Sequence, residues 1–292
     1  TESPLQFSIL NSQFSILISQ YSFLNLQQIS STQNPKIKHL LALQQKSSLR
    51  REEGLFVVEG RREIGHCIEA GYDIDSLFTL DIQGQEPLDA CLSTPSVPAE
   101  RTFTLTPNVY EKVAYRDSTE GVIAIVRAKK LFLSDLSLPR EPLIVVLESV
   151  EKPGNLGAVL RSADAAKVDA VMVCDPLTDL YNPNLIRSSI GAIFTVPVVA
   201  CTSQECIAFL KSNNIKILTA QLQDSELYYS TDMTCGTAIV MGTEATGLTP
   251  QWRKAADAHI RIPMLGALDS LNVSVSAAIL MYEAVRQRTM QG

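Results

Sequence analysis

Three segments in the second half of the chain combine glycine with polar side chains in a way that packing alone does not require. They are EKPGNLGAVLRSADA (151–165), IVMGTEATGL (239–248) and IPMLGALDSLNVSVSAAILMYEAVRQR (262–288). The first runs from a strand through a glycine-containing turn into a helix, a geometry that often faces a ligand. It places Asn155 at the turn and Arg161 about two helical turns further along. Gly154 and Gly157 could equally be turn and packing glycines.

The second segment is an apolar strand that ends in a loop with two glycines around an acid. Gly242 and Gly247 flank Glu244. Because ligands in open α/β sheets bind just past the carboxyl ends of the strands, Glu244 is a candidate for a binding or catalytic role. The alternative for Glu244 is a solvated loop acid or a helix cap, and the alternative for Gly242 is a tight turn.

The third segment is a glycine-containing loop that leads into the last helix. Its polar side chains lie where this helix begins: Ser270, Asn272, Ser274 and Ser276. We expect at least one of them to act only as an N-cap. The apolar residues that follow, Ala277, Ala278, Ile279 and Ala284, recur at helical spacing and are expected in the core.

Hydrophobic patterns predict the elements that must position these segments. In the second half, apolar strands alternate with helices, which is typical of a mainly parallel sheet covered by helices on both faces. The predicted strands are 143–147, 170–174, 193–199, 215–220 and 237–241, and the predicted helices are 156–166, 184–189, 203–212 and 273–288. The expected fold class is therefore α/β.

The first half predicts a smaller α/β domain. The expected elements are an amphipathic segment at 37–49, strands at 55–58, 76–80, 101–105 and 121–127, and helices at 61–70 and from residue 106. Residues 1–34 are rich in Ser, Gln and Asn and repeat FSIL, so we expect a disordered or non-native start there. The expected division is therefore this start, a domain at 35–128, a linker at 129–142 and a second domain at 143–292.

Charge is distributed unevenly along the chain. The net charge of −6 argues against a protein that coats nucleic acid through bulk charge. Between residues 35 and 62, however, seven Lys and Arg side chains stand against three Glu, an excess of four positive charges. This segment could be a basic footprint for nucleic acid or an ordinary solvated face.

Cysteine spacing argues against a metal site and against disulfides. The six cysteines contain no CxxC pair and the three histidines are scattered, so neither zinc spacing nor a disulfide framework is present. We expect reduced, mostly buried thiols in a cytoplasmic protein. The apolar runs are far shorter than the roughly 18 residues that span a bilayer, so we expect a soluble protein with no membrane contact.

Together and in this order, NLGAVLRSADA, MGTEATGL and SLNVSVSAAI resemble the three signature motifs of the SpoU/TrmH family of RNA ribose 2′-O-methyltransferases, in the SPOUT superfamily. The resemblance covers roughly residues 143–288. Over a shorter stretch, FVVEGRREI (56–64) is similar to the substrate-binding domain of that family. The resemblance implies methylation of a ribose 2′-hydroxyl in structured ribosomal or transfer RNA, with S-adenosylmethionine as cofactor.

The same resemblance implies a C-terminal trefoil knot in the parallel sheet and a homodimer formed through the knotted domain. It implies that the cofactor is lined by Gly242, Ile262 and Leu271. It assigns the catalytic region to Asn155, Arg161, Glu244, Ser270 and Asn272. The basic segment then becomes the expected RNA surface, with contacts from Lys36, Lys38, Arg50, Arg51, Arg61 and Arg62.

The chemistry of methyl transfer suggests a role for Arg161. A sulfonium is already a strong electrophile, so the protein must mainly align it with the ribose oxygen and manage the hydroxyl proton. Because a guanidinium holds its own proton firmly, we expect Arg161 to stabilise the forming alkoxide and an adjacent phosphate, with the proton passing to phosphate or water. Glu244 and Asn155 would orient the loops or Arg161, while Ser270 and Asn272 shape the site.

Three other interpretations remain open. A dinucleotide-dependent enzyme would carry GxGxxG after its first strand, whereas the turn here reads PGNLGAV. A non-catalytic RNA-binding protein would have no reason to keep Gly242, Ile262 and Leu271 around a pocket. The same fold could also methylate a base nitrogen, although the arginine and the serine-asparagine pattern favour ribose.

Overall fold

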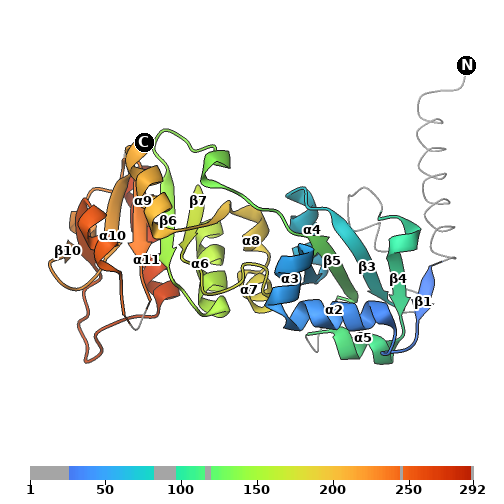
Figure 1. Cartoon of the computed structure of the whole chain (residues 1–292). Coiled ribbons are helices and arrows are strands. Elements are labelled where there is room, and N and C mark those ends of the chain that lie inside the picture. The colour runs from blue at the N-terminus through green and yellow to red at the C-terminus, as the bar shows by residue number, and fades with distance from the viewer. Residues whose placement is uncertain (1–25, 82–96, 116–119, 244–245, 291–292) are drawn as a thin grey trace, which may run out of the picture. The chain divides into compact units, whose positions relative to one another are not determined.

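The computed structural model of the chain describes residues 26–81, 97–115, 120–243 and 246–290. The chain divides into two compact units, Thr1–Ala128 and Lys129–Gly292, and each unit has its own sheet (Figure 1). The second unit carries all three motif segments. Within the described parts, no helix is both long enough and apolar enough to cross a bilayer.

The first unit is a mixed five-stranded sheet in the order β1-β4-β3-β5-β2. Strands β1, β4 and β3 are parallel, and β5 is antiparallel to both β3 and β2. The strands are β1 (Gln27–Ile29), β2 (Leu55–Glu59), β3 (Ile74–Leu80), β4 (Thr102–Leu105) and β5 (Val122–Arg127). The helices are α2 (Pro35–Gln45), α3 (Ser47–Glu53), α4 (Arg61–Glu69) and α5 (Pro107–Val113).

The first unit includes part of residues 1–34, whose composition predicts a disordered or non-native start. Gln27–Ile29 pair in parallel with Phe103–Leu105, and Ile29 is buried in the core of this unit. Strand pairing and the burial of Ile29 stabilise this stretch despite its polar neighbours, which composition alone cannot indicate. The domain therefore begins before Pro35, and the expectation for residues 1–25 lies outside the described residues.

The second unit is built on a seven-stranded sheet in the order β10-β12-β9-β11-β6-β7-β8, and every described pair is parallel. The strands are β6 (Leu143–Glu148), β7 (Ala170–Cys174), β8 (Val198–Cys201), β9 (Lys216–Ala220), β10 (Glu226–Leu227), β11 (Thr237–Met241) and β12 (Ala258–Arg261). Strands β6, β7 and β11 are buried along their whole length, as expected for strands covered on both faces. The predicted parallel α/β fold is confirmed.

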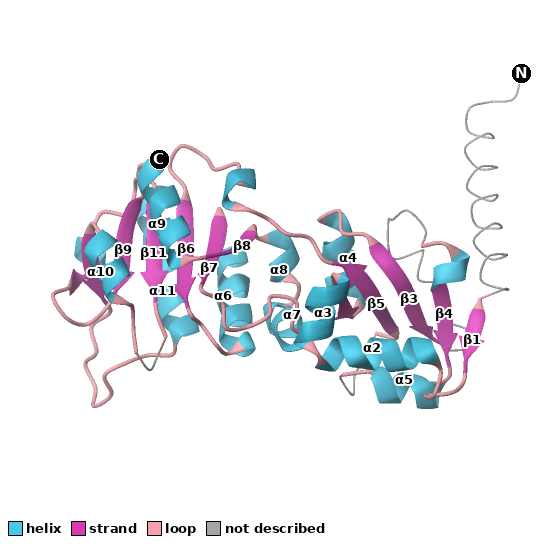
Figure 2. Cartoon of the chain, viewed as in Figure 1, coloured by secondary structure: helices cyan, strands magenta, loops and turns pink. Residues whose placement is uncertain are grey.

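Two groups of helices cover the second sheet (Figure 2). Helix α6 packs against α7, α8 and α11, while α9 packs against α10 and joins a separate core cluster with strands β6, β7 and β11. The helices are α6 (Pro153–Ala165), α7 (Pro183–Ser189), α8 (Ala192–Thr195), α9 (Ser203–Ser212), α10 (Pro250–Ala255) and α11 (Val273–Thr289). The α6–α11 face carries Asn155, Arg161 and Asn272.

One predicted strand is wrong. The pattern of residues 193–199 predicts an extended segment, but Ala192–Thr195 form helix α8 and the strand begins only at Val198. Ile190 and Gly191 both have left-handed backbone conformations that turn the chain into this short helix. Pro197 then keeps Val196 extended and lets β8 start behind it. The segment is rich in β-branched residues, which favour strands, so its sequence pattern did not indicate this break.

Local signals explain where the helices of the second unit begin. The Thr202 side chain caps α9 and Glu205 bonds back to the Thr202 backbone, so α9 opens with a complete capping box. Asn182 caps α7, and Pro183 occupies its first position. Helix α6 likewise starts with Pro153, three residues earlier than its predicted start at 156. Asn155 therefore lies in the first turn of α6 and not in the turn before it.

Candidate active site

The structure brings together two predicted site residues that are 117 positions apart. Asn272 Nδ2 donates a hydrogen bond to Asn155 Oδ1 at 3.1 Å. Asn155 belongs to the first turn of α6, and Asn272 precedes α11. The link therefore joins the first and third motif segments at the point where both helices start.

Asn272 is also the N-cap of the last helix. Its Oδ1 accepts hydrogen bonds from the Ser274 backbone N–H at 2.9 Å and from Ser274 Oγ at 2.6 Å. The expectation that one polar residue here caps α11 is confirmed, and that residue is Asn272. The same side chain thus fixes the start of α11 with its oxygen and reaches α6 with its nitrogen.

Arg161 lies on the exposed surface of α6. Among the described residues, it forms no hydrogen bond and no ion pair. Its guanidinium therefore keeps all its donors available to an anionic partner such as a phosphate or a developing alkoxide.

Gly157 explains how α6 is held against its neighbour. A Cβ at this position would lie 1.9 Å from Ser188 Oγ, 2.8 Å from the Ser189 nitrogen and 2.9 Å from the Leu185 oxygen. Helices α6 and α7 therefore pack at a distance that only glycine permits. The alternative of a packing glycine, weighed from sequence, is confirmed for Gly157.

A pocket opens beyond the carboxyl ends of β9 and β12, where open parallel sheets bind ligands. Its apolar wall comes from Ala220, Leu222, Ile260, Ile262, Met264 and Leu271. Gln221, Arg261, Asp269, Ser270 and Ser276 contribute the polar part of the lining. The pocket therefore gathers three of the predicted site residues, Ile262, Ser270 and Leu271, in one place.

Gly242 does not line this pocket. Glycine is required at this position for a different reason. A Cβ on Gly242 would lie 2.3 Å from both the carbonyl carbon and the oxygen of Gly247. The Gly247 N–H donates to the Thr243 oxygen at 2.9 Å, and these two residues form an isolated bridge. Gly242 therefore allows the chain after β11 to close tightly on itself. Glu244 lies outside the described residues.

A buried acid that the sequence did not single out anchors the chain behind this turn. Glu148, at the end of β6, is 2% exposed. Its carboxylate accepts hydrogen bonds from the Thr249 N–H at 2.9 Å and the Thr249 hydroxyl at 2.6 Å, and from Ser203 Oγ at 3.3 Å. Glu148 thereby ties the segment after Gly247 to the sheet. The sequence feature that could have identified Glu148 is its position at the end of an apolar strand.

The predicted RNA-contacting side chains of the first unit differ in their exposure. Lys38, Arg51 and Arg62 are exposed on α2, α3 and α4. Lys36 is exposed too, and its ammonium lies 4.4 Å from the centre of the Phe103 ring. Arg61 is half-buried, with its Nε donating to the Glu120 oxygen at 3.2 Å.

Arg50 does not belong to this surface. It is 4% exposed, and its Nη1 donates to the Leu43 oxygen at 2.5 Å and to the Gln44 oxygen at 3.1 Å. Because these carbonyls lie at the end of α2, Arg50 ties α3 to the last turn of α2. The sequence indicates its charge but not its burial, so the prediction of Arg50 as an RNA contact is wrong.

Comparisons with known proteins agree with both units. The SpoU rRNA Methylase family model matches residues 142–282, and the MRM3-like substrate binding domain model matches residues 34–124. The 23S rRNA (guanosine-2′-O-)-methyltransferase RlmB of Vibrio vulnificus is 37% identical over 190 residues, which cover 63% of this chain and 77% of the relative.

Two solved structures are similar over nearly the whole chain. An RNA 2′-O ribose methyltransferase has a TM-score of 0.78 and 37% identity, covering 90% of this chain and 100% of its own. The SpoU methyltransferase AviRb from Streptomyces viridochromogenes, in complex with the cofactor AdoMet, has a TM-score of 0.80 and 26% identity. That similarity covers 88% of this chain and 99% of AviRb.

Proposed function

The chain belongs to the SpoU rRNA methylase family, and we propose that it transfers the methyl group of S-adenosylmethionine to a ribose 2′-hydroxyl of ribosomal RNA. The observation that carries this proposal is the hydrogen bond between Asn272 and Asn155. It joins two family motifs beside a ligand pocket to which Leu271, the neighbour of Asn272, contributes. Because RlmB is a 23S rRNA enzyme, the large-subunit RNA is the substrate we infer.

The pocket suits S-adenosylmethionine. Ile262 and Leu271 offer apolar surfaces of the kind that enclose an adenine ring. The polar lining, with Ser270 and Asp269, can serve the hydrophilic part of the molecule. Gly242 acts indirectly, by letting the chain after β11 fold closely. When bound, S-adenosylmethionine supplies an electrophilic methyl group.

In this proposal Arg161 stabilises negative charge. Its free guanidinium approaches the ribose oxygen as the proton leaves, and it can hold a neighbouring phosphate at the same time. Since arginine remains protonated at any working pH, the proton passes to phosphate or water. Asn155 and Glu244 orient Arg161 or the surrounding loops, while Ser270 and Asn272 shape the site.

We also propose that the chain is knotted at its C-terminal end. Helix α11 follows β12, which lies near one edge of the sheet, yet it packs against β6, β11 and α6. The chain therefore returns from the edge to the middle of the sheet after β12. This return supports the trefoil knot that the family resemblance implies.

A homodimer is the assembly we propose for the second unit. Val275 and Tyr282 are exposed apolar side chains on α11, and Leu265 and Leu268 are exposed on the loop before it. Burial of such residues between two copies would contribute favourable free energy. Sedimentation velocity of the full chain should show a dimer, and a monomer at micromolar concentration would contradict this assignment.

The first unit is proposed to bind the RNA. Its match to a substrate binding domain supports this role, and so does the exposure of Lys38, Arg51 and Arg62. Phosphate contacts from these side chains would position the RNA without reading its sequence. An acidic protein can therefore bind a polyanion through one local surface.

The test is methyl transfer to large-subunit ribosomal RNA that lacks its native modifications. Labelled S-adenosylmethionine is incubated with this RNA and the full chain, and the RNA is then digested to nucleosides. The proposal predicts label in a 2′-O-methylnucleoside. Label in a base-methylated nucleoside would overturn the ribose assignment. Label that appears only with transfer RNA would overturn the ribosomal substrate.

A further inference from the structure

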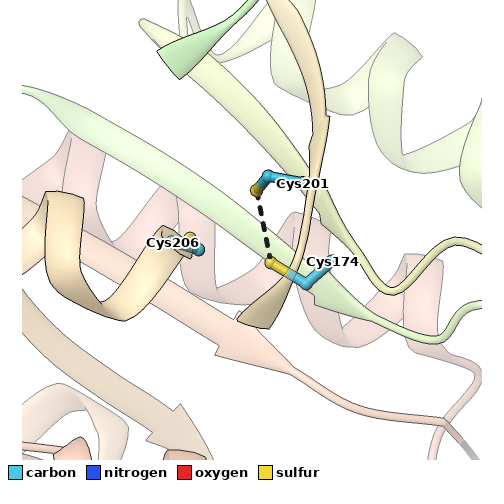
Figure 3. Close-up of side chains that lie close together, drawn as sticks. All are labelled: Cys174, Cys201 and Cys206. Carbon is cyan, nitrogen blue, oxygen red and sulfur yellow. Dashed lines mark hydrogen bonds between the residues drawn. The ribbon is translucent and has the colours of Figure 1, made fainter. Parts of the chain in front are cut away.

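Three cysteines converge on the α9 side of the second sheet. The sulfur atoms of Cys174, Cys201 and Cys206 all lie within 4.8 Å of one another (Figure 3). Cys174 and Cys206 are buried, whereas Cys201 is half-buried. The Sγ atoms of Cys174 and Cys201 are 3.9 Å apart.

The fold places these thiols with well-defined elements. Cys174 and Cys201 are the last residues of β7 and β8 and are direct partners in the parallel register of these strands. Cys206 comes from α9, the helix that follows β8. A fourth sulfur lies beside them, because Cys206 Sγ is 3.1 Å from Met172 Sδ. The cluster is therefore built on strands and a helix and not on a loop.

The spacing of the sulfurs matches that of ligands around one ion. With a metal–sulfur bond of about 2.3 Å, two thiolates sharing a metal lie about 3.8 Å apart in tetrahedral geometry and about 4.0 Å apart in trigonal geometry. The Cys174 to Cys201 distance of 3.9 Å falls between these two values. Only small side-chain movements would be needed to bring the third thiol to the same ion.

We propose that Cys174, Cys201 and Cys206 form a binding site for monovalent copper, with Met172 as a neighbouring thioether. Structural zinc sites usually take four cysteine or histidine ligands, and this cluster includes no histidine. Thiolates and a thioether are soft ligands of the kind that select Cu(I). Cys201 is half-buried, so one of the three ligands is partly accessible from solvent.

The charge of the cluster also favours a cation. Binding of Cu(I) would release the thiol protons to solvent, and the positive charge of the ion would offset one of the resulting thiolate charges. The carboxylates of Glu205 and Asp175 lie near enough to Cys201 to add to the negative potential.

This site is separate from the methyltransferase site. Cys174 and Cys206 belong to the core cluster between the sheet and α9 and α10, whereas Asn155, Arg161 and Asn272 belong to α6 and the start of α11. Copper binding can therefore be tested without any assay of methyl transfer. Failure of one proposal leaves the other intact.

The experiment is an anaerobic titration of the reduced full chain with Cu(I) in competition with the coloured chelator bicinchoninate. The chain should remove one copper ion per molecule from the chelator, and X-ray absorption should show sulfur ligands at about 2.3 Å. The Cys201→Ser variant should lose this ion, whereas the Cys235→Ser control, at another half-buried cysteine, should keep it. Circular dichroism checks that both variants fold.

Three outcomes would overturn the proposal. The first is no copper uptake from the chelator by the folded chain. The second is equal uptake by the Cys201→Ser variant, because the copper would then be bound elsewhere. The third is uptake of Zn²⁺ but not Cu(I) by the three cysteines, which would assign the cluster to a different ion.

Discussion

Asn272 has two separate roles, one for each end of its side-chain amide. Its oxygen caps α11, and its nitrogen donates to Asn155 on α6. The first interaction concerns the stability of a helix, whereas the second concerns the geometry of the site. Substitutions can separate these contributions, because other residues can cap a helix without reaching α6.

The Asn272→Ala variant should lose both interactions. Loss of an N-cap costs about 1 kcal/mol of stability, and methyl transfer should fall at the same time. The Asn272→Ser variant keeps a capping oxygen on a shorter side chain, so it should retain most of the stability and still lose methyl transfer. Thermal unfolding and transfer rates measure the two effects. Equal activity of Asn272→Ser and the parent chain would show that the link to Asn155 has no functional role.

For single residues, the sequence predicted which side chains belong to the site but not which contacts they make. The resemblance of the motifs to the family signatures assigns Asn155 and Asn272 to the catalytic region. It does not show that the two amides bond to each other, since that contact depends on how α6 and α11 pack. The prediction for Arg50 is wrong for a similar reason, because its neighbours in sequence are exposed charges while its own guanidinium bonds to α2.

At the scale of elements, the packing of α6 on α7 controls where Asn155 and Arg161 lie. Gly157 is in close contact with α7, whereas an added Cβ on Gly154 would meet nothing within 4 Å. Both glycines belong to α6. They therefore form a matched pair in which the same substitution has opposite expected effects.

The Gly157→Ala variant should lose about 1–3 kcal/mol, because the added methyl group overpacks the contact with α7. The Gly154→Ala variant should gain up to about 1 kcal/mol, because alanine favours a helix over glycine. Scanning calorimetry of the full chain would measure both changes in the transition of the second unit. A Gly157→Ala variant as stable as the parent would contradict the close packing of α6 and α7.

Strand and helix positions were largely predictable in the second unit, because buried parallel strands give continuous apolar runs between amphipathic helices. The short elements could not be predicted from the sequence. The pattern of helix α8 predicts a strand, and β10 and β12 were not predicted at all. Their conformation is imposed by neighbours in the fold and not by their own pattern. The cysteine cluster was missed because its members come from β7, β8 and α9.

At the scale of the whole molecule, RNA binding must overcome a net charge of −6. This requires a local basic surface, which we assign to exposed side chains of the first unit. Removal of one such side chain from a phosphate reduces the slope of log affinity against log salt by about 0.7–0.9. The number of phosphates that the protein neutralises can therefore be counted from the salt dependence of binding.

Replacement of Lys38, Arg51 and Arg62 by glutamine should weaken RNA binding and reduce the salt slope by about 2–3. Cofactor affinity should not change, because the pocket belongs to the second unit. A matched control removes three exposed positive charges from α9 and α10, namely Lys211, Arg253 and Lys254. If the control reduced the slope as much as the first variant did, RNA binding would not be specific to the first unit.

Single-turnover methyl transfer with saturating RNA and S-adenosylmethionine measures whether Arg161 acts on the reacting ribose. Cofactor affinity is measured in parallel by calorimetry. We predict that Arg161→Ala and Arg161→Lys bind the cofactor like the parent chain but transfer the methyl group at least about tenfold more slowly, which corresponds to about 1.4 kcal/mol in the transition state. Near-normal rates for Arg161→Lys would contradict a role that depends on the geometry of the guanidinium, and near-normal rates for Arg161→Ala would remove Arg161 from the reaction.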